Sequence, residues 1–189
     1  MGEHLLKMNR VSIFIDGNNF YHGLRFMYGQ DKSLKDFNFD EFIKFLIGKR
    51  ELVEVFYYNA ELDKSRNLNK HSSQEEFFSK LRQIPKFNLI LCKLLKRRIK
   101  NSNEYYYVLK EDDLHMAVDM VEGAYDNKFD VAIIVSGDGD FVPAVKSVKR
   151  KNKQVENFYF KKSSSRNLKN YCDSSLELNK KILDQFFKS

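Results

Sequence analysis

The chain has 189 residues and a mass of 22.5 kDa, which is the size of one compact domain. Its hydrophobic fraction of 42% supports a full core, and its 8 glycines and 2 prolines exclude flexible linkers and low-complexity tracts. Lys and Arg outnumber Asp and Glu by 33 to 26, and the resulting net charge of +7 is compatible with a polyanionic partner without requiring one.

The two cysteines and the N-terminus bound the protein class further. Cys92 and Cys172 cannot form a Cys-rich zinc site, and we expect packed thiols in a reducing compartment, although a disulfide is neither required nor excluded. The first ten residues lack an apolar signal core, and no apolar run approaches the roughly 18 residues of a membrane span. We therefore expect one domain over residues 1–189, cytoplasmic and without membrane contact.

Hydrophobic periodicity predicts two strands and two helices in the first half of the chain. A β-branched-rich strand is expected at Val11–Asp16, and an amphipathic helix at Phe39–Ile47. A second strand follows at Leu52–Tyr58. Helical spacing of apolar residues then predicts a helix at Glu75–Gln83, which Pro85 stops.

Strands and helices alternate through the second half of the chain as well. The expected elements, in order, are a strand at Asn88–Leu95, its hairpin partner at Glu104–Leu109, a helix at Asp112–Tyr125, a strand at Val131–Val135, a helix at Phe141–Lys151, a strand at Val155–Phe160 and a final helix at Ser174–Phe187. This alternation predicts an α/β fold with a mainly parallel sheet of about five strands, covered on both faces, plus an extra hairpin strand.

Aspartates follow two of the expected strands. Asp16 ends the first strand, and Asp138 and Asp140 follow the strand at Val131–Val135. Ligands of such sheets bind beyond the carboxyl ends of the strands. Asp113 begins a helix that runs antiparallel to the strand it precedes, so we expect it at the same edge.

Carboxylates crowded at one edge repel each other unless a cation neutralises them. Mg²⁺ and Mn²⁺ prefer carboxylate oxygens, and such a metal lowers the pKa of an attacking water and balances charge on a phosphate. The pattern therefore predicts a metal site with hydrolytic potential.

Each residue also has a structural interpretation. Asp140 could cap the following helix, and Asp112 or Asp113 the earlier one. Asp112 and Asp119 also fall on one helical face, which could extend the site or simply face solvent. The three histidines that follow the N-terminal segment are expected on the surface or in the core rather than as ligands; these are His22, His71 and His115. It is the joint occurrence of acids at strand ends that favours a functional site.

Three blocks of the sequence stand out as motifs: IFIDGNN (Ile13–Asn19), DLHMAVDM (Asp113–Met120) and IIVSGDGDFVPAV (Ile133–Val145). They closely resemble the motifs of the NYN-domain family, a group of PIN-like nucleases, and the chain most resembles its bacterial LabA-like branch. A weaker fourth block, Ser165–Leu178, is similar to the segment that closes those domains. The resemblance extends from about Asn9 to Leu178 and implies a three-layer α/β/α PIN-like fold.

The resemblance also implies roles for individual residues. The metal-binding acids would be Asp16, Asp113, Asp138 and Asp140, with further catalytic-site positions at Asn18, Ser136 and Asp119. The chain departs from the family where Lys110, Glu111 and Asp112 replace a Lys-Gly-Val-like lead into Asp113, which changes the charge near the site. Asn152 stands where the family usually has a glycine, which changes a turn.

Basic clusters supply candidate contacts to RNA phosphates, and tyrosines can stack on unpaired bases. The candidates are Lys96, Arg97, Arg98, Lys100 and Tyr106 in the expected hairpin, and Lys161, Lys162 and Arg166 after the last expected strand. The other interpretation of each cluster is an ordinary solvated face.

The leading hypothesis is a metal-dependent RNA endonuclease that holds one or two Mg²⁺ or Mn²⁺ ions and needs no small organic cofactor. One alternative is an RNA- or protein-binding NYN module with little or no catalysis, and another is a different metal-assisted phosphoesterase. Asn18 stands where an aspartyl-nucleophile phosphatase would have its second acid, and no P-loop is present. The natural RNA, the preference between RNA and DNA, and the oligomeric state, a homodimer included, stay open.

Overall fold

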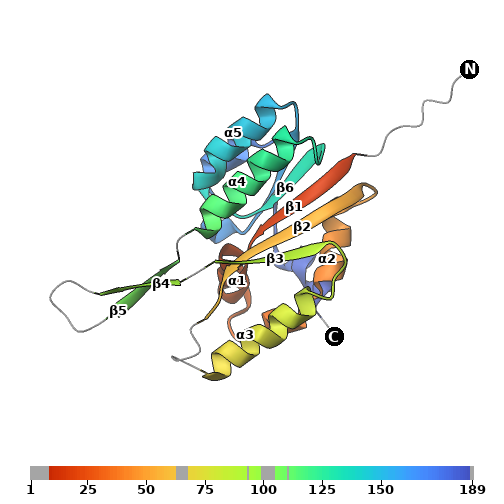
Figure 1. Cartoon of the computed structure of the whole chain (residues 1–189). Coiled ribbons are helices and arrows are strands. Elements are labelled where there is room, and N and C mark those ends of the chain that lie inside the picture. The colour runs from red at the N-terminus through yellow and green to blue at the C-terminus, as the bar shows by residue number, and fades with distance from the viewer. Residues whose placement is uncertain (1–8, 63–67, 93, 99–104, 110, 188–189) are drawn as a thin grey trace, which may run out of the picture.

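The computed structural model describes residues 9–62, 68–92, 94–98, 105–109 and 111–187 of the chain (Figure 1). Six strands form one parallel sheet in the order β3-β2-β1-β6-β7-β8. Their bounds are β1 Arg10–Asp16, β2 Glu51–Ala60, β3 Phe87–Cys92, β6 Val131–Val135, β7 Gln154–Tyr159 and β8 Ser174–Glu177. The expected parallel α/β sheet is confirmed, with six strands instead of about five.

Helices cover both faces of this sheet, which gives the expected three-layer arrangement (Figure 1). One face packs against α1 Gly17–Tyr28, α2 Phe39–Ile47, α3 Leu68–Leu81 and α7 Lys180–Leu183. The other face packs against α4 Asp112–Tyr125, α5 Val142–Arg150 and α6 Arg166–Tyr171. Short 3-10 helices are η1 Leu34–Asp36, η2 Gly139–Phe141, η3 Lys161–Ser163 and η4 Asp184–Phe186. None of the helices in the described ranges is long and apolar enough to cross a membrane.

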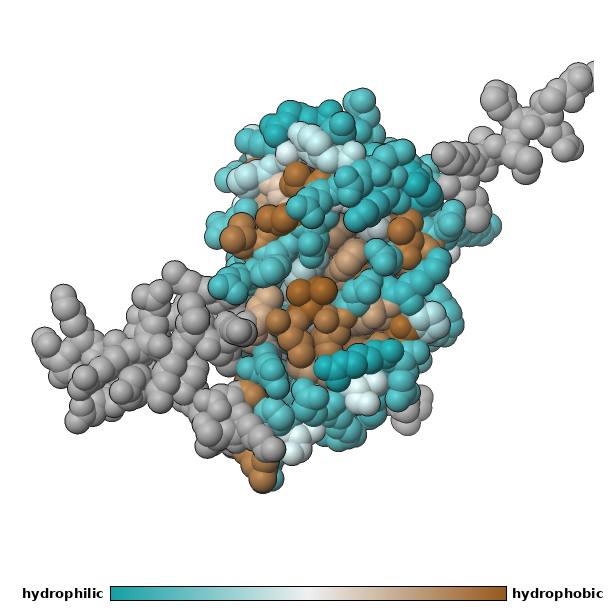
Figure 2. All heavy atoms as spheres, viewed as in Figure 1, coloured by the Kyte–Doolittle hydropathy of each residue, from teal (hydrophilic) through white to brown (hydrophobic). Residues whose placement is uncertain are grey.

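The central strands β1 and β6 are buried on both faces, which explains their largely apolar sequences. Successive side chains of β1 point to opposite faces. Ile13 and Ile15 join the core beneath α1 and α2, whereas Phe14 joins the core beneath α4 and α5. Toward β2 and the edge strand β3, apolar surface is visible between α4 and α3 (Figure 2).

The pairing of β1 with β6 positions the residues that follow both strands. These strands are parallel neighbours in register from Val11 opposite Val131 to Ile15 opposite Val135. Parallel neighbours deliver their carboxyl ends to the same edge of the sheet. Asp16 and the segment that begins at Ser136 therefore emerge side by side.

The expected final helix over Ser174–Phe187 is wrong. Ser174–Glu177 forms β8, which pairs with β7 from Glu156 opposite Ser174 to Tyr159 opposite Glu177, and α7 begins only at Lys180. Asp173 anchors the start of this strand, because its Oδ2 accepts a hydrogen bond of 2.8 Å from the Val155 backbone N–H. The sequence SSLE has no strong preference of its own, so pairing along the exposed edge of β7 decides its conformation.

Other elements differ from expectation as well. The helix expected at Glu75–Gln83 is α3, which begins earlier, at Leu68, and ends at Leu81. The segment expected as one strand at Asn88–Leu95 divides into β3 and β4 Leu94–Arg98. β4 pairs antiparallel with β5 Tyr105–Leu109 in a separate two-stranded sheet, so the hairpin adds no strand to the central sheet. Helices α1 and α6 were not expected. The Asp-Gly pair at Asp16, which is typical of a turn, instead caps α1.

A hydrogen bond between two layers suggests a test of how α4 is held on the sheet. The Tyr58 hydroxyl of β2 donates to Asp119 Oδ2 of α4 at 2.8 Å. We expect Tyr58→Phe to lower the free energy of unfolding by about 1–2 kcal/mol, because a partly buried carboxylate loses its donor. Urea denaturation followed by circular dichroism measures the change.

Tyr57→Phe is the matched control in the same strand. The Tyr57 hydroxyl is buried and has no partner at hydrogen-bonding geometry among the described residues, so its removal should be neutral or stabilising. Equal losses in both variants would mean that the cost comes from removing a hydroxyl from a packed site, and not from losing the bond to Asp119.

Candidate metal centre

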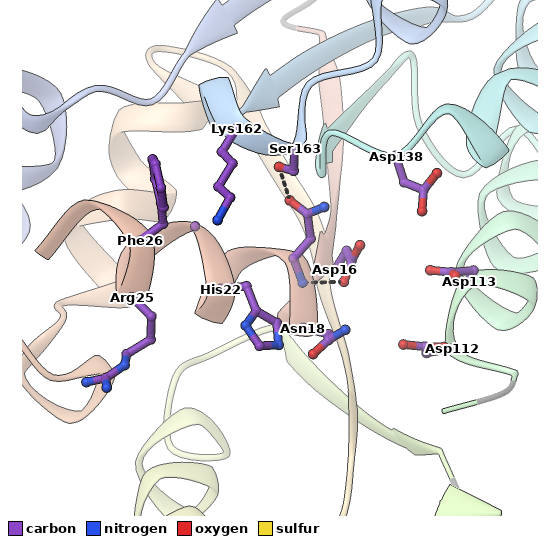
Figure 3. A pocket seen from close by; sticks show the side chains of 12 residues that line it. Asp16, Asn18, His22, Arg25, Phe26, Asp112, Asp113, Asp138, Lys162 and Ser163 are labelled. Carbon is purple, nitrogen blue, oxygen red and sulfur yellow. Dashed lines mark hydrogen bonds between the residues drawn. The ribbon is translucent and has the colours of Figure 1, made fainter. Parts of the chain in front are cut away.

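A cavity of about 710 Å³ lies at the carboxyl edge of the sheet, beyond the ends of β1 and β6 (Figure 3). Its lining residues are Asp16, Asn18, Asn19, His22, Gly23, Arg25, Phe26, Asp112, Asp113, Asp138, Lys162 and Ser163. They come from the strand ends, from α1, from the start of α4 and from η3.

Asp16 is the buried centre of the site, with 7% of its surface exposed. Its Oδ1 accepts a hydrogen bond of 2.9 Å from the Asn19 backbone N–H and so caps α1, and its Oδ2 accepts one of 2.9 Å from the Ser136 hydroxyl. These bonds fix the orientation of the carboxylate. Each oxygen still has a lone pair for a further ligand.

Ser136 couples Asp16 to Asp138. While the Ser136 hydroxyl donates to Asp16, its Oγ accepts from the Asp138 backbone N–H at 3.1 Å. The Ser136 carbonyl accepts from the buried Asn157 amide of β7 at 2.7 Å, which holds the end of β6. Gly137 follows, and a β-carbon there would lie 2.2 Å from the Ser163 carbonyl oxygen, so only glycine lets η3 approach the site this closely.

The start of α4 adds two more carboxylates. One carboxylate oxygen from each of Asp16, Asp112 and Asp113 lies within 4.8 Å of the others. Asp112 is buried and Asp113 is exposed to the cavity. The N-termini of α1 and α4 both meet this cluster, and their partial positive charge favours anionic side chains.

The crowding of these acids makes them hard to ionise. Burial raises the pKa of Asp16 to about 6, with further contributions from the charges of Asp112 and Asp138. Burial also raises the pKa of Asp113 to about 7, and here four neighbouring carboxylates contribute, Asp140 among them. Burial likewise raises the pKa of Asp112. A divalent cation would relieve this repulsion, and an all-oxygen donor set fits Mg²⁺ or Mn²⁺.

The other predicted acids lie further from the centre. Asp138 lines the cavity, and its Oδ1 accepts from the Asp140 backbone N–H at 2.9 Å, so Asp138 caps η2. Asp140 is exposed and is not among the lining residues, although its charge reaches Asp113. Asp119 is bound by the Tyr58 hydroxyl, one layer below the cavity.

The predicted RNA-contact residues divide between the cavity and the hairpin. Lys162 lines the cavity, and Lys161 and Arg166 are exposed beside it in η3 and α6. In the hairpin, the backbones of Lys96, Arg97 and Arg98 pair with Tyr107, Tyr106 and Tyr105. The side chains of this hairpin and the whole of Lys100 lie outside the described residues.

Some cavity residues had only an open interpretation from the sequence, and others were missed. Asp112 was interpreted as a helix cap, as a departure from the family pattern, or as part of a helical face that could extend the site, and its carboxylate does join the cluster. Asn18 was the amide that the family resemblance implied, and it lines the cavity. Asn19 also lines the cavity, and its Oδ1 accepts from the Ser163 hydroxyl at 3.0 Å and so ties η3 to α1. Arg25 and Phe26 carried no motif, and the missing signal was the α1 helix itself, which places both on the cavity side.

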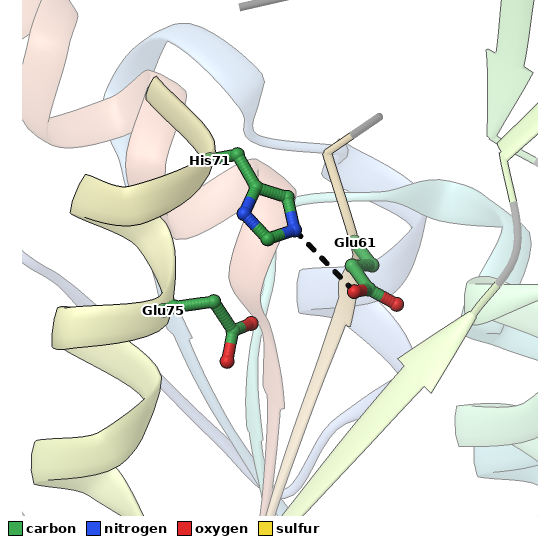
Figure 4. A group of neighbouring side chains, drawn as sticks. All are labelled: Glu61, His71 and Glu75. Carbon is green, nitrogen blue, oxygen red and sulfur yellow. Dashed lines mark ion pairs between the residues drawn. The ribbon is translucent and has the colours of Figure 1, made fainter. Parts of the chain in front are cut away.

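A second group with metal-binding side chains consists of Glu61, His71 and Glu75 (Figure 4). His71 Nε2 lies 3.6 Å from Glu61 Oε1, and Arg82 approaches Glu75 at 3.7 Å. Surface ion pairs of this kind account for the charges of the group without a metal. His71 was expected on the surface or in the core, and it lies outside the main cavity, whereas His22 lines that cavity.

Comparisons with known proteins agree with the fold and the motifs. The model of the NYN-domain family matches residues 10–179. The low amplitude and bright protein LabA of Synechococcus elongatus is 25% identical over 174 residues, which cover 90% of this chain and 84% of LabA, in agreement with the predicted LabA-like branch. A crystal structure of a protein of unknown function, VPA0982 of Vibrio parahaemolyticus, matches the whole of both chains with a TM-score of 0.66 and 22% identity.

Because the pKa of Asp113 is raised, replacing this residue should stabilise the metal-free protein, and the stabilisation should grow with pH. In EDTA, the wild type loses stability as the pH rises from about 4, the usual carboxyl pKa of an unfolded chain, through about 7, the pKa of Asp113 in the fold. Asp113→Asn avoids this loss. Its free energy of unfolding relative to wild type should therefore increase by about 1 kcal/mol between pH 5 and pH 8, a value reduced for the partial exposure of this side chain.

Urea denaturation at both pH values measures this difference, with Asp126→Asn as the control. Asp126 is an exposed acid just beyond the opposite end of α4, where it pairs with Lys128. A difference for Asp113→Asn that does not change with pH would show that its carboxylate is not under repulsion.

Proposed function

The chain belongs to the NYN-domain family, and on that premise we propose that it is a metal-dependent ribonuclease that cuts RNA internally. The observation that carries the proposal is the convergence of Asp16, Asp112 and Asp113 within 4.8 Å in a cavity that Asp138 also lines. Asp16 and Asp138 also cap α1 and η2, but capping does not require carboxylates to converge in an open cavity, whereas a nuclease requires such a cluster to hold its metal.

We propose that Asp16, Asp113 and Asp138 hold the ion, with Asp112 and Asp140 adding negative charge around it. A bound Mg²⁺ or Mn²⁺ supplies charge neutralisation at the phosphate and a lowered pKa for the attacking water. The chain itself orients the acids: Ser136 fixes Asp16 and Asp138 relative to each other, and Asn19 fixes Asp16 from the backbone. The amide of Asn18, at the cavity wall, is placed to orient water or a phosphate oxygen.

RNA is the proposed substrate, and basic side chains around the acid cluster would hold its phosphates. Lys161, Lys162 and Arg166 lie on the η3–α6 side of the cavity and would guide the strand toward it. The β4–β5 hairpin, with Lys96, Arg97, Arg98, Lys100 and Tyr106 in or beside it, would extend this path. We place the activity in the cytoplasm, in a single domain, as the sequence predicts.

Cleavage assays with an unstructured RNA, in Mn²⁺, Mg²⁺ or EDTA, test the proposal. The wild type should cut the RNA internally with either metal and not in EDTA. Asp138→Asn should fold as well as wild type, since the asparagine Oδ1 can still accept from the Asp140 backbone N–H. It should nevertheless lose activity by on the order of 100-fold or more, because a metal ligand is lost.

Asp126→Asn serves again as the matched control and should retain wild-type cleavage. A wild type that binds RNA but does not cut it in either metal would favour the binding-module alternative. Full activity of Asp138→Asn would mean that this residue is only the cap of η2.

A further inference from the structure

Phe26 is an apolar side chain in an unexpected place. It lies in the last turn of α1 with 63% of its surface exposed, and it lines the cavity across from the acids (Figure 3). Exposure of a large ring costs hydrophobic free energy that packing would recover. A ring exposed inside a cavity that also holds a candidate catalytic centre is positioned to contact a ligand.

The cavity is divided by charge. Asp112, Asp113 and Asp138 stand on one side, whereas Arg25 and Lys162 stand around Phe26 on the other (Figure 3). A ligand that spans the cavity would thus meet cations and an aromatic ring at one end and the acids at the other. A polynucleotide has the matching chemistry, because its phosphates pair with cations and its bases stack on rings.

Two elements hold the aromatic end in place. The Lys162 Nζ lies 4.2 Å from the centre of the Phe26 ring, in the geometry of a cation–π contact. Lys162 belongs to η3, and the Ser163 hydroxyl beside it donates to Asn19 of α1 at 3.0 Å. Gly23 of α1 has no room for a β-carbon, which would lie 2.3 Å from the Phe160 ring just before η3. The ring and the cation are therefore set on two closely packed elements.

Similar pairs elsewhere in the described chain do not line this cavity. Lys151 lies over the Tyr125 ring at 4.7 Å, and Lys146 lies over the Tyr171 ring at 4.2 Å. Tyr125 is 52% exposed at the far end of α4 from the acids. A cation over an exposed ring is thus a common surface feature here, and its position beside the acids distinguishes the pair at Phe26.

We infer that Phe26, Lys162 and Arg25 form a subsite for an unpaired nucleotide of the RNA, with the base stacked on Phe26 and a phosphate bound by the two cations. The inference rests on the proposed ribonuclease function. Phe26 is nine residues after Gly17, so it stands about 14 Å along α1 from the helix start that Asp16 caps, at 1.5 Å per residue, or about four nucleotides at a stacked spacing of 3.4 Å. Bases inside a duplex cannot be offered to the ring, so the subsite selects single strands.

Binding, measured apart from cleavage, tests the subsite. Fluorescence anisotropy with a labelled 12-nucleotide unstructured RNA is measured in Mg²⁺ in the Asp138→Asn background, which keeps the RNA intact. Adding Phe26→Ala should weaken binding by about 5- to 100-fold, the range expected for the loss of one stacked base. Phe26→Trp should restore it, and Phe26→Leu should not, because leucine is apolar but has no aromatic face. Lys162→Ala should reduce the slope of affinity against salt by about 0.7, as expected for one lost phosphate contact.

Two controls make the result specific. Tyr125→Ala removes a comparable exposed ring with its own lysine and should leave binding unchanged. A 12-base-pair RNA duplex should bind equally well with and without Phe26→Ala. Unchanged single-strand binding in Phe26→Ala, full binding in Phe26→Leu, or an equal loss on duplex RNA would each overturn the subsite.

The two proposals can fail separately. If the wild type does not cut RNA in Mn²⁺ or Mg²⁺ but Phe26→Ala still loses single-strand binding, the ribonuclease proposal falls and the subsite stands. If cleavage is metal-dependent and Phe26→Ala binds and cuts like wild type, the subsite falls and the ribonuclease proposal stands.

Discussion

The parallel pairing of β1 with β6 is the constraint on which the site depends. Because the two strands are neighbours and run in the same direction, the carboxylate at the end of one is delivered next to the turn at the end of the other. Ser136 then converts this proximity into fixed geometry, since its hydroxyl bonds Asp16 and also accepts from the Asp138 backbone. The antiparallel direction of α4 relative to β6 adds Asp112 and Asp113 from a third element.

Burial and charge repulsion within the acid cluster explain why it would bind a cation. The acids are partly removed from water and surrounded by like charge, which raises the pKa of Asp16 to about 6 and that of Asp113 to about 7. Two helix N-termini offset part of this repulsion without neutralising it. The remaining repulsion lowers the stability of the metal-free fold near neutral pH, and a divalent cation in the cavity would recover that loss.

The sequence predicts the positions of most of the acids well, because the ends of buried strands can be recognised from the sequence. Apolar runs that stop at Asp16 and before Asp138 predict which edge carries the acids, and the direction of the preceding helix predicts Asp113. Burial of Asp112 could not be predicted, since it depends on how α4 packs. β8 was missed because its conformation is set by pairing with β7 instead of by its own residues. Phe26 was missed because a lone exposed ring has no pattern until α1 is known.

The central claim is that the acid cluster holds a divalent cation, and anomalous diffraction from crystals soaked in Mn²⁺ tests it most directly. A peak should appear within about 2.5 Å of carboxylate oxygens of Asp16 and of Asp113 or Asp138, a distance typical of a hard cation bound by oxygen. It should disappear in Asp16→Asn crystals. The absence of any peak there at saturating Mn²⁺, or a peak only at Glu61, His71 and Glu75, would contradict the claim.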